Sequence, residues 1–474
     1  MPAYYVSTRR NNNYAQYTED NTISHRREEL HDHRQNRTSA GLPPSEELDN
    51  HRHNLTSVGL SSINDVFFDS NMCHELRRPS ASEIRYRHTY WQVQQDGHED
   101  IVVYSAFYDD RPIVGVLPWI RILGVRRLSD THVWCYVWYF QKETPFVTQA
   151  EVIATGADQS VKNGEVYSQN LFSCQLNRSN FIPTHVSIAT TLCANSTISL
   201  EITRPAKSDK WIHNFGVCLE VNFGYFPPEL IVEWMEAYSI FGITHVNIYN
   251  GSIDSRLDRV FDYYRQKGIL EIRQMPPAVE DYTIDGVRLG SPASLNDCMM
   301  RNMYSHRFIV VVDFDEFIVP RFHNNYLDMI RYIDRSENRA TSHHTYSFRN
   351  AYFFKYFPED ESQPKALKTL RLRYRAQPSD FLFGTKSFVD PRQCLSVFNH
   401  YCWIRFPSSN SRSVDVETTV ALSHHYRAVC PFDKDQCDRY DKQKVRDDIM
   451  FKYKDELQNR ISKVLKFISS SIAD

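Results

Sequence analysis

Three acidic residues follow an apolar run in the segment VVVDFDEFIVP, namely Asp313, Asp315 and Glu316. The run Phe308–Val312 predicts a buried strand, so these carboxylates fall at its solvent end. On an extended chain, two residues separated by one position point to the same side, where their carboxylates can share a hard divalent cation. An Asp-x-Asp pair can also form a turn or cap a helix. Three acidic groups directly after an apolar strand favour a metal site over a plain turn.

Strands and helices alternate from Phe215 onward, and this alternation must position the acidic segment. The strand-like runs are GVCLEVNFG, THVNIYN, ILEIRQ and FIVVVD, with helix-like segments between them. The first helix opens at Pro227 and Pro228, and its apolar residues recur with helical spacing. Such alternation indicates a parallel sheet with helices on both faces, which binds ligands beyond the carboxyl ends of its strands. The strand end at Asp313 is the most charged of these, so the functional site is expected there.

The length of 474 residues exceeds what one hydrophobic core supports, so we expect several parts. Residues 1–83 are rich in Asn, Arg, His, Ser and Glu without a sustained period, and predict a disordered stem. Residues 84–208 carry short alternating runs of β-branched and aromatic residues, which predict a β-rich segment. Residues 209–430 form the expected α/β domain, and residues 431–474 predict a charged helical tail.

The composition excludes some classes of function and indicates the cellular compartment in which the chain folds. A formal net charge of −3 offers no electrostatic footprint for phosphate backbones, so a nucleic-acid binder is not expected. No apolar stretch is long enough to cross a bilayer, and the N-terminus shows no signal peptide. The ten cysteines contain no CxxC pair, and N-x-Ser/Thr sequons begin at Asn36, Asn54, Asn177, Asn195 and Asn250. Cysteines and sequons together indicate an oxidising compartment.

Four segments in fixed order resemble glycosyltransferase family 92. They are HNFGVCLEVNFGYFPPELIVEWMEAYSIFGITHVNIYN, LNDCMMRNMYSHRFIVVVDFDEFIVP, KSFVDPRQCLSVFNH and LSHHYR. The similarity runs from about Ile101 to about Arg427 and is strongest after Phe215. The resemblance implies a GT-A-like, Rossmann-type mixed sheet with helices on both faces. It also implies a nucleotide-sugar transferase, because the family includes enzymes that transfer galactose.

The resemblance also implies a metal site. Asp313 and Asp315 match the family's Asp-x-Asp box and are assigned to Mn²⁺ or Mg²⁺, with Asp315 the favoured direct ligand. A third ligand is expected downstream, where His400 and the pair His424 and His425 match family positions and imidazole is an acceptable ligand for manganese. We assign the third ligand to His400, although a lone histidine is more often a core or surface residue.

The nucleotide diphosphate is the leaving group of such a reaction, so cationic side chains must meet its developing charge. Lys386 and Arg427 are the residues that we place on the diphosphate, with a solvated surface position as the alternative for each. Asp297 matches the family's Asn-Asp-Cys pattern and is assigned to the uridine or ribose of the donor. Its alternative role is a helix N-cap.

Transfer with inversion also needs a general base that takes the proton of the acceptor hydroxyl. Glu316, Asp415 and Glu417 are the carboxylates nearest the matched segments, and the sequence does not choose among them. Glu316 can instead cap the segment after the box. Asp415 and Glu417 lie in an alternating run that also suits a strand with outward polar residues.

The expected function is therefore a metal-dependent transfer of a hexose, with galactose favoured, from a UDP-sugar to a glycan or glycoprotein acceptor with inversion. Two alternatives stay open. One is a non-catalytic protein that binds a glycan or nucleotide sugar. The other is a phosphatase of the haloacid dehalogenase type, which is disfavoured because Phe317 stands where that box has Thr or Val.

The resemblance implies a location in the Golgi lumen or membrane, because the family usually has a type II membrane layout. Association with a membrane is expected on the same ground, yet this sequence shows neither an anchor nor a signal. The residues before about 80 also depart from the family's layout, so an anchor missing from this sequence and a soluble member both stay open.

Overall fold

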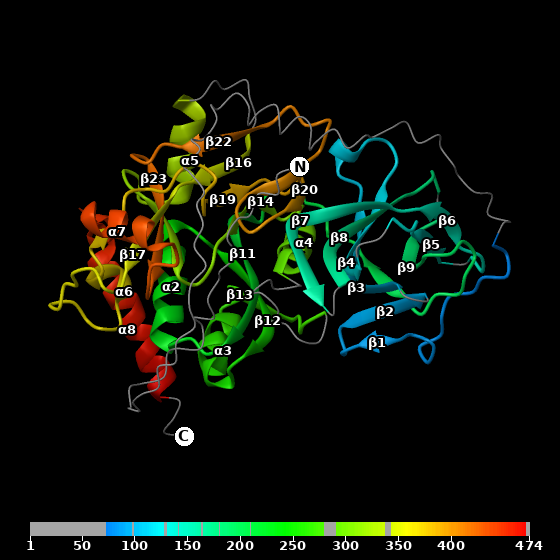
Figure 1. The fold of residues 1–474 in the computed structure, drawn as a ribbon, viewed down its shortest axis with the longest axis horizontal. Coiled ribbons are helices and arrows are strands. Elements are labelled where there is room, and N and C mark those ends of the chain that lie inside the picture. The colour runs from blue at the N-terminus through cyan, green and yellow to red at the C-terminus, as the bar shows by residue number, and fades with distance from the viewer. Residues whose placement is uncertain are drawn as a thin grey trace, which may run out of the picture.

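The computed structural model describes residues 73–470, apart from residues 97–98, 128–129, 141, 163–164, 180, 209, 279–290 and 337–342. Most of the predicted stem, residues 1–72, lies outside the described residues. Residues 73–83 are described, and Cys73 there forms a disulfide with Cys193. Two large sheets dominate the molecule, one on the right of Figure 1 and one near its centre, with helix α4 (Ser291–Asn302) between them.

The first sheet contains ten strands among the described residues, in the order β6-β5-β9-β10-β3-β4-β8-β7, with β2 on β3 and β1 on β2. It curls around a core that includes Val103, Ile122, Val137 and Ile188, so both ends of the strand order face one another across it. The strands are β1 Tyr86–Arg87, β2 Trp91–Asp96, β3 Glu99–Asp109, β4 Trp119–Arg127, β5 Trp134–Tyr139, β6 Phe146–Gln149, β7 Glu151–Lys162, β8 Glu165–Gln175, β9 Pro183–Ala189 and β10 Leu200–Thr203. The short helix η2 spans Pro112–Val114.

The second sheet has seven strands in the order β13-β12-β11-β14-β19-β16-β22. The first four run parallel, β19 is antiparallel to both β14 and β16, and β22 is parallel to β16. The sheet is thus mixed, as predicted. Its strands are β11 His213–Gly224, β12 His245–Ile253, β13 Leu270–Gln274, β14 His306–Val311, β16 His343–Phe348, β19 Lys386–Val389 and β22 Arg412–Val416.

Helices cover both faces of this sheet, as predicted. Alternate residues of β11 point to opposite faces: Val217 and Leu219 join the core under α2 (Pro228–Phe241) and α3 (Asp258–Gln266). Cys218 and Val221 instead join the core that α4 shares with β3, β4 and β8 of the first sheet. α4 is therefore the layer between the two sheets.

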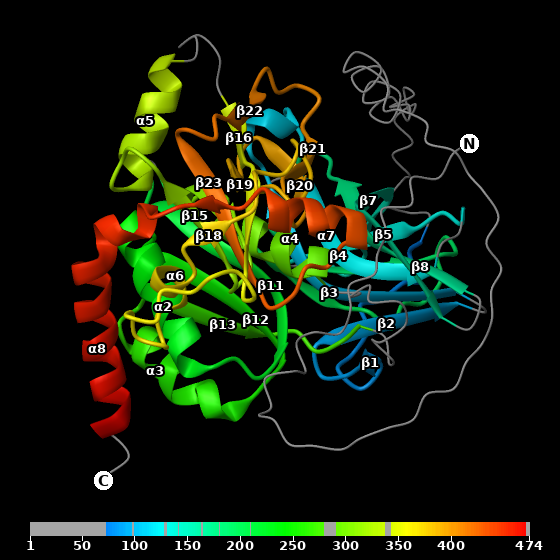
Figure 2. The ribbon, with the colours of Figure 1, turned by 60° about the vertical axis from the view of Figure 1, so that its left-hand side comes forward.

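Smaller elements complete the second half of the chain. A three-stranded sheet has the order β15-β23-β17, and the pairs β18–β24 and β20–β21 stand apart from it. Figure 2 shows α8 along the outer side of α2 and α3, where its residues Leu457, Ile461 and Val464 join the core. These elements are η3 Ser255–Leu257, β15 Glu316–Pro320, α5 Tyr326–Ser336, β17 Asn350–Phe354, α6 Lys368–Arg371, β18 Tyr374–Arg375, β20 Cys394–Val397, β21 Cys402–Arg405, β23 Ala421–Arg427, α7 Lys434–Lys442, β24 Val445–Arg446, η4 Ile449–Tyr453 and α8 Lys454–Ser470.

All ten cysteines form disulfides: Cys73–Cys193, Cys135–Cys174, Cys218–Cys298, Cys394–Cys402 and Cys430–Cys437. The Cys218–Cys298 bond joins β11 to α4, and so fixes the middle layer to the second sheet. Full pairing of this kind is typical of proteins folded in an oxidising compartment.

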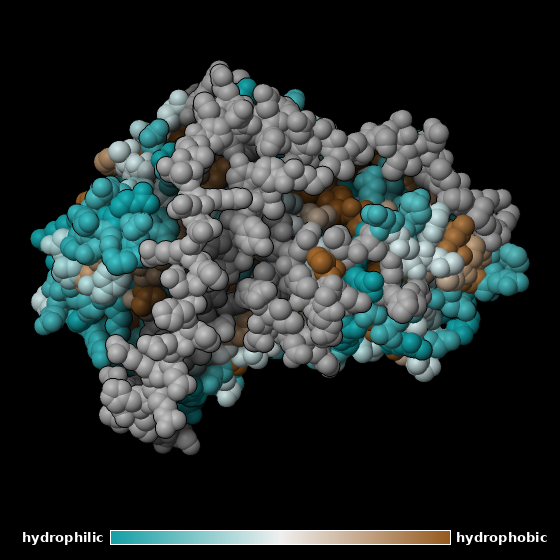
Figure 3. Space-filling view, viewed as in Figure 1, coloured by the Kyte–Doolittle hydropathy of each residue, from teal (hydrophilic) through white to brown (hydrophobic). Residues whose placement is uncertain are grey.

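The visible surface near α7 is mostly hydrophilic (Figure 3), in keeping with a helix that has no buried residue. Within the part of the chain that the structure describes, no helix is long and apolar enough to cross a membrane.

Candidate functional site

The strand order of the second sheet reverses between β11 and β14. Successive strands are added outward from β11 to β12 and β13, and the chain then returns to place β14 on the other side of β11. In open α/β sheets this reversal opens a crevice at the carboxyl ends of the two strands, where ligands bind. Asp313 lies just past the end of β14 at Val311, so the acidic segment stands at this crevice.

The acidic residues lie on a tight turn between β14 and β15. The backbone N–H of Glu316 donates to the carbonyl of Asp313 at 3.1 Å, and the Glu316 carboxylate accepts from the backbone N–H of Asp313 at 2.9 Å. The strand ends earlier than the sequence suggests, so the side-chain alternation expected of an extended chain does not apply to Asp313 and Asp315. Each of these two residues has its own basic partner.

Side chains of helix α2 form hydrogen bonds with the backbone of this turn. Trp234 Nε1 donates to the carbonyl of Asp313 at 3.0 Å and to that of Glu316 at 3.2 Å. Tyr238 donates its hydroxyl to the Glu316 carbonyl at 3.1 Å. Phe314, between the two aspartates, is buried edge-on against the Trp234 ring. The amphipathic face predicted for this helix therefore fixes the backbone of the acidic turn.

Lys386, the first residue of β19, neutralises one side of the turn. Its Nζ lies 3.2 Å from Asp313 Oδ2 and 3.0 Å from Glu316 Oε2, and it donates to the carbonyl of Asn399 at 3.1 Å. Burial alone would lower the pKa of the Lys386 ammonium, but Asp313 and Glu316 outweigh it and raise that pKa. Burial raises the pKa of the Glu316 carboxyl, which is only 2% exposed, although Lys386 opposes this. Lys386 is thus an internal counter-ion of the turn, and not a solvated surface lysine.

His425 contacts the other side of the turn. Strand β23 pairs with β15 so that His425 stands opposite Glu316. Its Nε2 lies 3.3 Å from Asp315 Oδ2 and its Nδ1 3.2 Å from Glu316 Oε1. Burial would raise the pKa of Asp315, but His425, with Arg427 and Lys368 beyond it, holds that pKa below its usual value. Asp315 is therefore ionised at neutral pH.

Asp315, Glu316 and His425 form a group whose ligand atoms all lie within 4.8 Å of one another. Two carboxylates and one imidazole are a donor set that suits Mn²⁺. Within the described residues, His400 does not belong to this group. His400 lies in the loop between β20 and β21, two strands that the Cys394–Cys402 disulfide joins. Its Nδ1 is 2.8 Å from the carbonyl of Thr385.

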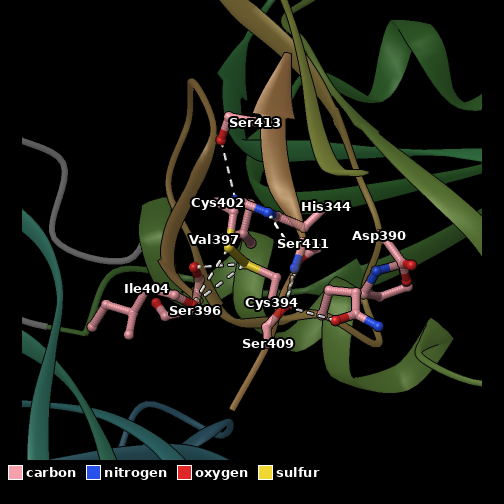
Figure 4. The surroundings of a disulfide bond; sticks show 12 residues. His344, Asp390, Cys394, Ser396, Val397, Cys402, Ile404, Ser409, Ser411 and Ser413 are labelled. Atoms are coloured by element: carbon pink, nitrogen blue, oxygen red, sulfur yellow. Dashed lines mark hydrogen bonds between the residues drawn. A yellow bond between two sulfur atoms is a disulfide. The ribbon is translucent and has the colours of Figure 1, made fainter. Parts of the chain in front are cut away.

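Figure 4 shows how firmly this disulfide is framed. Ser411 and Ser413 approach the two ring nitrogens of His344 at 3.0 and 3.1 Å, and Ser409 contacts Gln393 at 2.8 Å. The loop that carries His400 is held by hydrogen bonds from Lys386 Nζ to the Asn399 carbonyl and from the Ser387 hydroxyl to the His400 carbonyl. The assignment of His400 to the metal stays a prediction, while the structure places His425 in direct contact with the acidic turn.

The two histidines of LSHHYR serve different environments, because neighbouring residues of a strand face opposite ways. His424 is buried beside Phe353, at a ring separation of 4.6 Å, and burial lowers its pKa to about 4. It is a neutral core residue. Only His425 of this pair reaches the acidic turn.

Two further cations stand near Asp315. Arg427 ends β23, and Lys368 begins α6 and donates from Nζ to the carbonyl of Tyr426 at 2.9 Å. Both act electrostatically on Asp315 and favour its charged form. Sequence reasoning found Arg427 but missed Lys368, because α6 is a separate short helix that no pattern connects to the acidic segment.

The structure corrects the interpretation of Asp297. This residue lies inside α4 and is fully buried, so it is not an N-cap. Its carboxylate accepts hydrogen bonds from Ser105 at 2.6 Å, Tyr249 at 2.6 Å and Arg301 at 2.7 and 3.1 Å. Both carboxylate oxygens are thus engaged by groups from β3, β12 and α4. Asp297 ties the two sheets to the middle layer and has no oxygen to offer a donor nucleotide.

The three candidate bases are separated by the fold. Glu316 is buried in the turn. Asp415 lies on the edge strand β22, where its Oδ2 accepts from Arg349 Nη2 at 2.8 Å. Glu417 is exposed in the turn after β22. Asp415 pairs in register with Ser347, which pairs with Ser387 opposite Val311 of β14. Asp415 is therefore level with the end of β14, three strands or about 14 Å away across the sheet.

A buried glutamate of α2 predicts how the stability of the protein depends on pH. Glu233 of α2 accepts from the backbone N–H groups of Lys368 and Thr369 at 3.0 and 2.9 Å, and burial raises its pKa to about 7. The folded protein binds a proton at Glu233 more tightly than the unfolded chain does, because the Glu233 pKa is about 7 in the folded state instead of the usual 4.5. Protonation of Glu233 therefore stabilises the fold fully below pH 4.5, and this stabilisation is lost as the pH rises to 7. Glu233→Gln should remove this loss, which is at most about 3 kcal/mol.

The measurement is the thermal midpoint of wild type and Glu233→Gln at several pH values between 4 and 8. The wild type should lose stability relative to the variant across this window. Glu229→Gln, in the first turn of the same helix, serves as the matched control and should track the wild type. A constant difference between wild type and Glu233→Gln would contradict the prediction.

The strand order β13-β12-β11-β14, with a carboxylate turn at its point of reversal, defines an open α/β sheet of the kind that binds ligands at this position. The chain belongs to glycosyltransferase family 92, whose family model matches residues 213–461, more than half of the 474 residues. The resemblance inferred from the sequence is thereby confirmed, and the class of the chain is that of a glycosyltransferase.

Two relatives from Caenorhabditis elegans match parts of the chain. Glycosyltransferase family 92 protein F13G3.3 is 30% identical over 124 residues, which is 24% of this chain and 24% of that protein. Beta-1,4-galactosyltransferase galt-1 is 28% identical over 120 residues, which is 24% of this chain and 27% of that protein. The aligned region thus spans about a quarter of the length of each relative.

Two solved structures match at low similarity. The crystal structure of S. aureus TarS 1-349 gives a TM-score of 0.25 at 11% identity, covering 45% of this chain and 60% of that one. The same protein in complex with UDP gives a TM-score of 0.24 at 12% identity, covering 46% and 61%.

Proposed function

We propose that this protein is a metal-dependent hexosyltransferase that moves galactose from UDP-galactose to a glycan or glycoprotein acceptor with inversion. The observation that carries the proposal is the acidic turn at the reversal point of the sheet, balanced by Lys386 and His425, in a member of glycosyltransferase family 92. The name of the relative galt-1 favours galactose as the transferred sugar.

The residues present fit a divalent cation of the Mn²⁺ type. Asp315 and His425 lie together, and Glu316 completes a group of oxygen and nitrogen donors that converge within 4.8 Å. Asp313, on the same turn, remains the other carboxylate assigned to the ion. Few protein carboxylates suffice, because ions of this type also take oxygens from substrate phosphates. When bound, such an ion acts as a Lewis acid on the diphosphate leaving group.

The chain's own residues bind and orient the donor. Arg427 and Lys368, which already act on Asp315, are the cations that we assign to the diphosphate. Lys386 contacts both Asp313 and Glu316, holds their carboxylates in place and is therefore a positioning residue. The hydrogen bonds from α2 keep the turn rigid, so its charges need little rearrangement when the leaving group departs.

We assign the general base to one of the two carboxylates at β22, the edge strand of the sheet. Glu316 is unsuited because its carboxylate is buried and bonded to Lys386 and His425. Asp415 and Glu417 remain, since Asp415 has a fixed orientation from Arg349 and Glu417 is exposed. The two candidates are distinguished by the variants Asp415→Asn and Glu417→Gln. Replacement of the base should abolish turnover without weakening donor binding.

The proposed location is the Golgi, in its lumen or at its membrane. Five disulfides support an oxidising compartment. Two described sequons, at Asn177 and Asn195, lie on exposed residues where a glycan can be attached. Association with the membrane is part of the proposal and rests on the family's usual layout.

The test is an assay of UDP release by the purified chain with UDP-galactose, Mn²⁺ and a panel of glycans. We expect UDP and an elongated glycan in the presence of Mn²⁺, and neither after chelation. UDP-glucose and UDP-N-acetylglucosamine, as competing donors, identify the sugar. Absence of UDP and of product with every donor would leave only glycan or nucleotide-sugar binding, and release of phosphate from a generic ester would indicate a phosphatase.

A further inference from the structure

Three histidines lie together at the amino-terminal ends of parallel strands in the seven-stranded sheet. The acidic turn lies at the carboxyl ends of these strands. His213 begins β11, His245 begins β12 and His306 begins β14, and these three strands are adjacent and parallel. Because Asp313 follows the far end of β14, the histidines and the acidic turn are separated by the length of a strand, about 20 Å. The two clusters are therefore separate sites.

A glycine makes room for the cluster. His213 pairs in register with His306, and Gly216 pairs with His245. The His306 ring lies over Gly216 so closely that a Cβ there would collide with its Cδ2 and Nε2 atoms. The missing side chain lets the ring reach across β11 toward His245 on the next strand. Any larger residue at position 216 would close this path.

The ring nitrogens converge. His245 Nδ1 lies 3.1 Å from His306 Nε2, and one ligand nitrogen from each of the three histidines falls within 4.8 Å of the others. Two imidazole nitrogens bound to one tetrahedral Zn²⁺ at about 2.0–2.1 Å stand about 3.3 Å apart. The His245 and His306 nitrogens already have almost this separation, so an ion requires only a small movement of the His213 ring.

The outer contacts are those of a metal-binding imidazole. The Thr244 hydroxyl lies 2.7 Å from His213 Nδ1, and the Ser305 hydroxyl lies 2.8 Å from His306 Nδ1. These contacts orient the rings and leave the Nε2 atom of each facing the cluster. His245 Nε2 approaches Glu271 Oε2 at 3.9 Å, so its Nδ1 faces the cluster while a carboxylate stands behind it. Such a partner behind an imidazole is the usual outer shell of a zinc ligand.

The access to the cluster also suits a metal. His306 is buried, whereas His213 and His245 are partly exposed. An ion can therefore enter from the His213 side, and water can occupy a fourth position.

We propose that His213, His245 and His306 bind one Zn²⁺ ion, which joins the starts of β11, β14 and β12 and is independent of the acidic turn. Zinc is the expected metal because three imidazoles around a small tetrahedral site favour it over Mn²⁺ and Mg²⁺, which prefer oxygen. The ion is structural, since it lies a full strand length from the crevice.

The test uses the full chain, stripped with a chelator, returned to metal-free buffer and titrated with Zn²⁺ against a chromophoric competitor. We expect one tightly bound zinc per chain in the wild type and also in Asp315→Asn. His213→Asn and His245→Gln should weaken that binding by about a hundredfold or more. His132→Gln, an exposed histidine on the first sheet, is the matched control and should bind like the wild type.

Two further readouts separate a lost ligand from a damaged fold. Zn²⁺ should raise the thermal midpoint of the wild type but not that of His213→Asn, while their midpoints without metal stay alike. Co²⁺ in place of Zn²⁺ should give the visible absorption bands of a tetrahedral site, and these should disappear in His245→Gln. Lack of zinc binding by the wild type, or unchanged binding by both histidine variants, would overturn the proposal. Loss of the zinc in Asp315→Asn alone would also overturn it, because the ion would then belong to the acidic turn.

Discussion

Replacing Asp315 by asparagine is expected to reduce sugar transfer at least about a hundredfold while leaving the fold intact. Asp315 is the carboxylate of the turn that contacts His425, and His425, Arg427 and Lys368 hold its pKa below the usual value. Asparagine has the same size but no charge, so it is a poor ligand for Mn²⁺. Mn²⁺ affinity measured by calorimetry should fall together with UDP release.

Some stability should be lost, because Lys368 and Arg427 lose a counter-charge, so the thermal midpoint is measured beside the activity. The backbone carbonyl of residue 315, which accepts from the Tyr426 N–H at 2.8 Å, is retained in the variant. Asp258→Asn, an exposed acid at the start of α3, is the control and should keep full activity. Unchanged Mn²⁺ affinity in Asp315→Asn would move the metal away from this turn.

The fold of the second sheet could be predicted because its signals are local. Apolar strands, the Pro-Pro helix start and the spacing of Trp234 and Tyr238 all lie within short segments. The position of Asp313 at a carboxyl strand end followed from the same alternation. The mixed character of the sheet came from the family resemblance alone, since β19, β16 and β22 are short strands without a distinctive pattern.

The partners of the acidic turn could not be predicted, because they come from long-range pairing. His425 meets Glu316 only through the register of β15 with β23, and Lys386 comes from β19, which pairs with β14 in the seven-stranded sheet. Asp297 was misread for a similar reason. Its carboxylate is satisfied by Ser105, almost two hundred residues away along the chain, and no local pattern reveals such a contact.

The three histidines illustrate the same limit. His213 and His245 lie in one matched segment and His306 in another, so neither their spacing nor their neighbours suggest a ligand set. They become a cluster only because parallel strands begin at the same edge of the sheet.

The largest effect on stability is expected at Asp109, the last residue of β3. Its fully buried carboxylate accepts from Arg111 Nε and Nη2, both at 2.8 Å, and from Arg121 Nε at 3.1 Å. Arg111 also donates to the carbonyl of Cys394 at 2.8 Å, and therefore links the first sheet to the loop region of the second. Asp109→Ala would leave two buried guanidinium groups without their counter-ion, which costs about 3–5 kcal/mol.

The neighbouring residue provides a matched control for this prediction. Asp110 is partly exposed, pairs with the exposed Lys207 and accepts from the Tyr304 hydroxyl at 2.7 Å, so Asp110→Ala should cost about 1–2 kcal/mol, less than Asp109→Ala. Burial opposes ionisation of Asp109, but the two arginines hold its pKa below the usual 3.8. Its stabilising contribution is thus present above pH 4 and is lost as the pH falls further, so the gap between wild type and Asp109→Ala should narrow in acid. Chemical denaturation at pH 7 and near pH 3 measures this gap, and equal losses in the two alanine variants would show that the buried pair is not what joins the sheets.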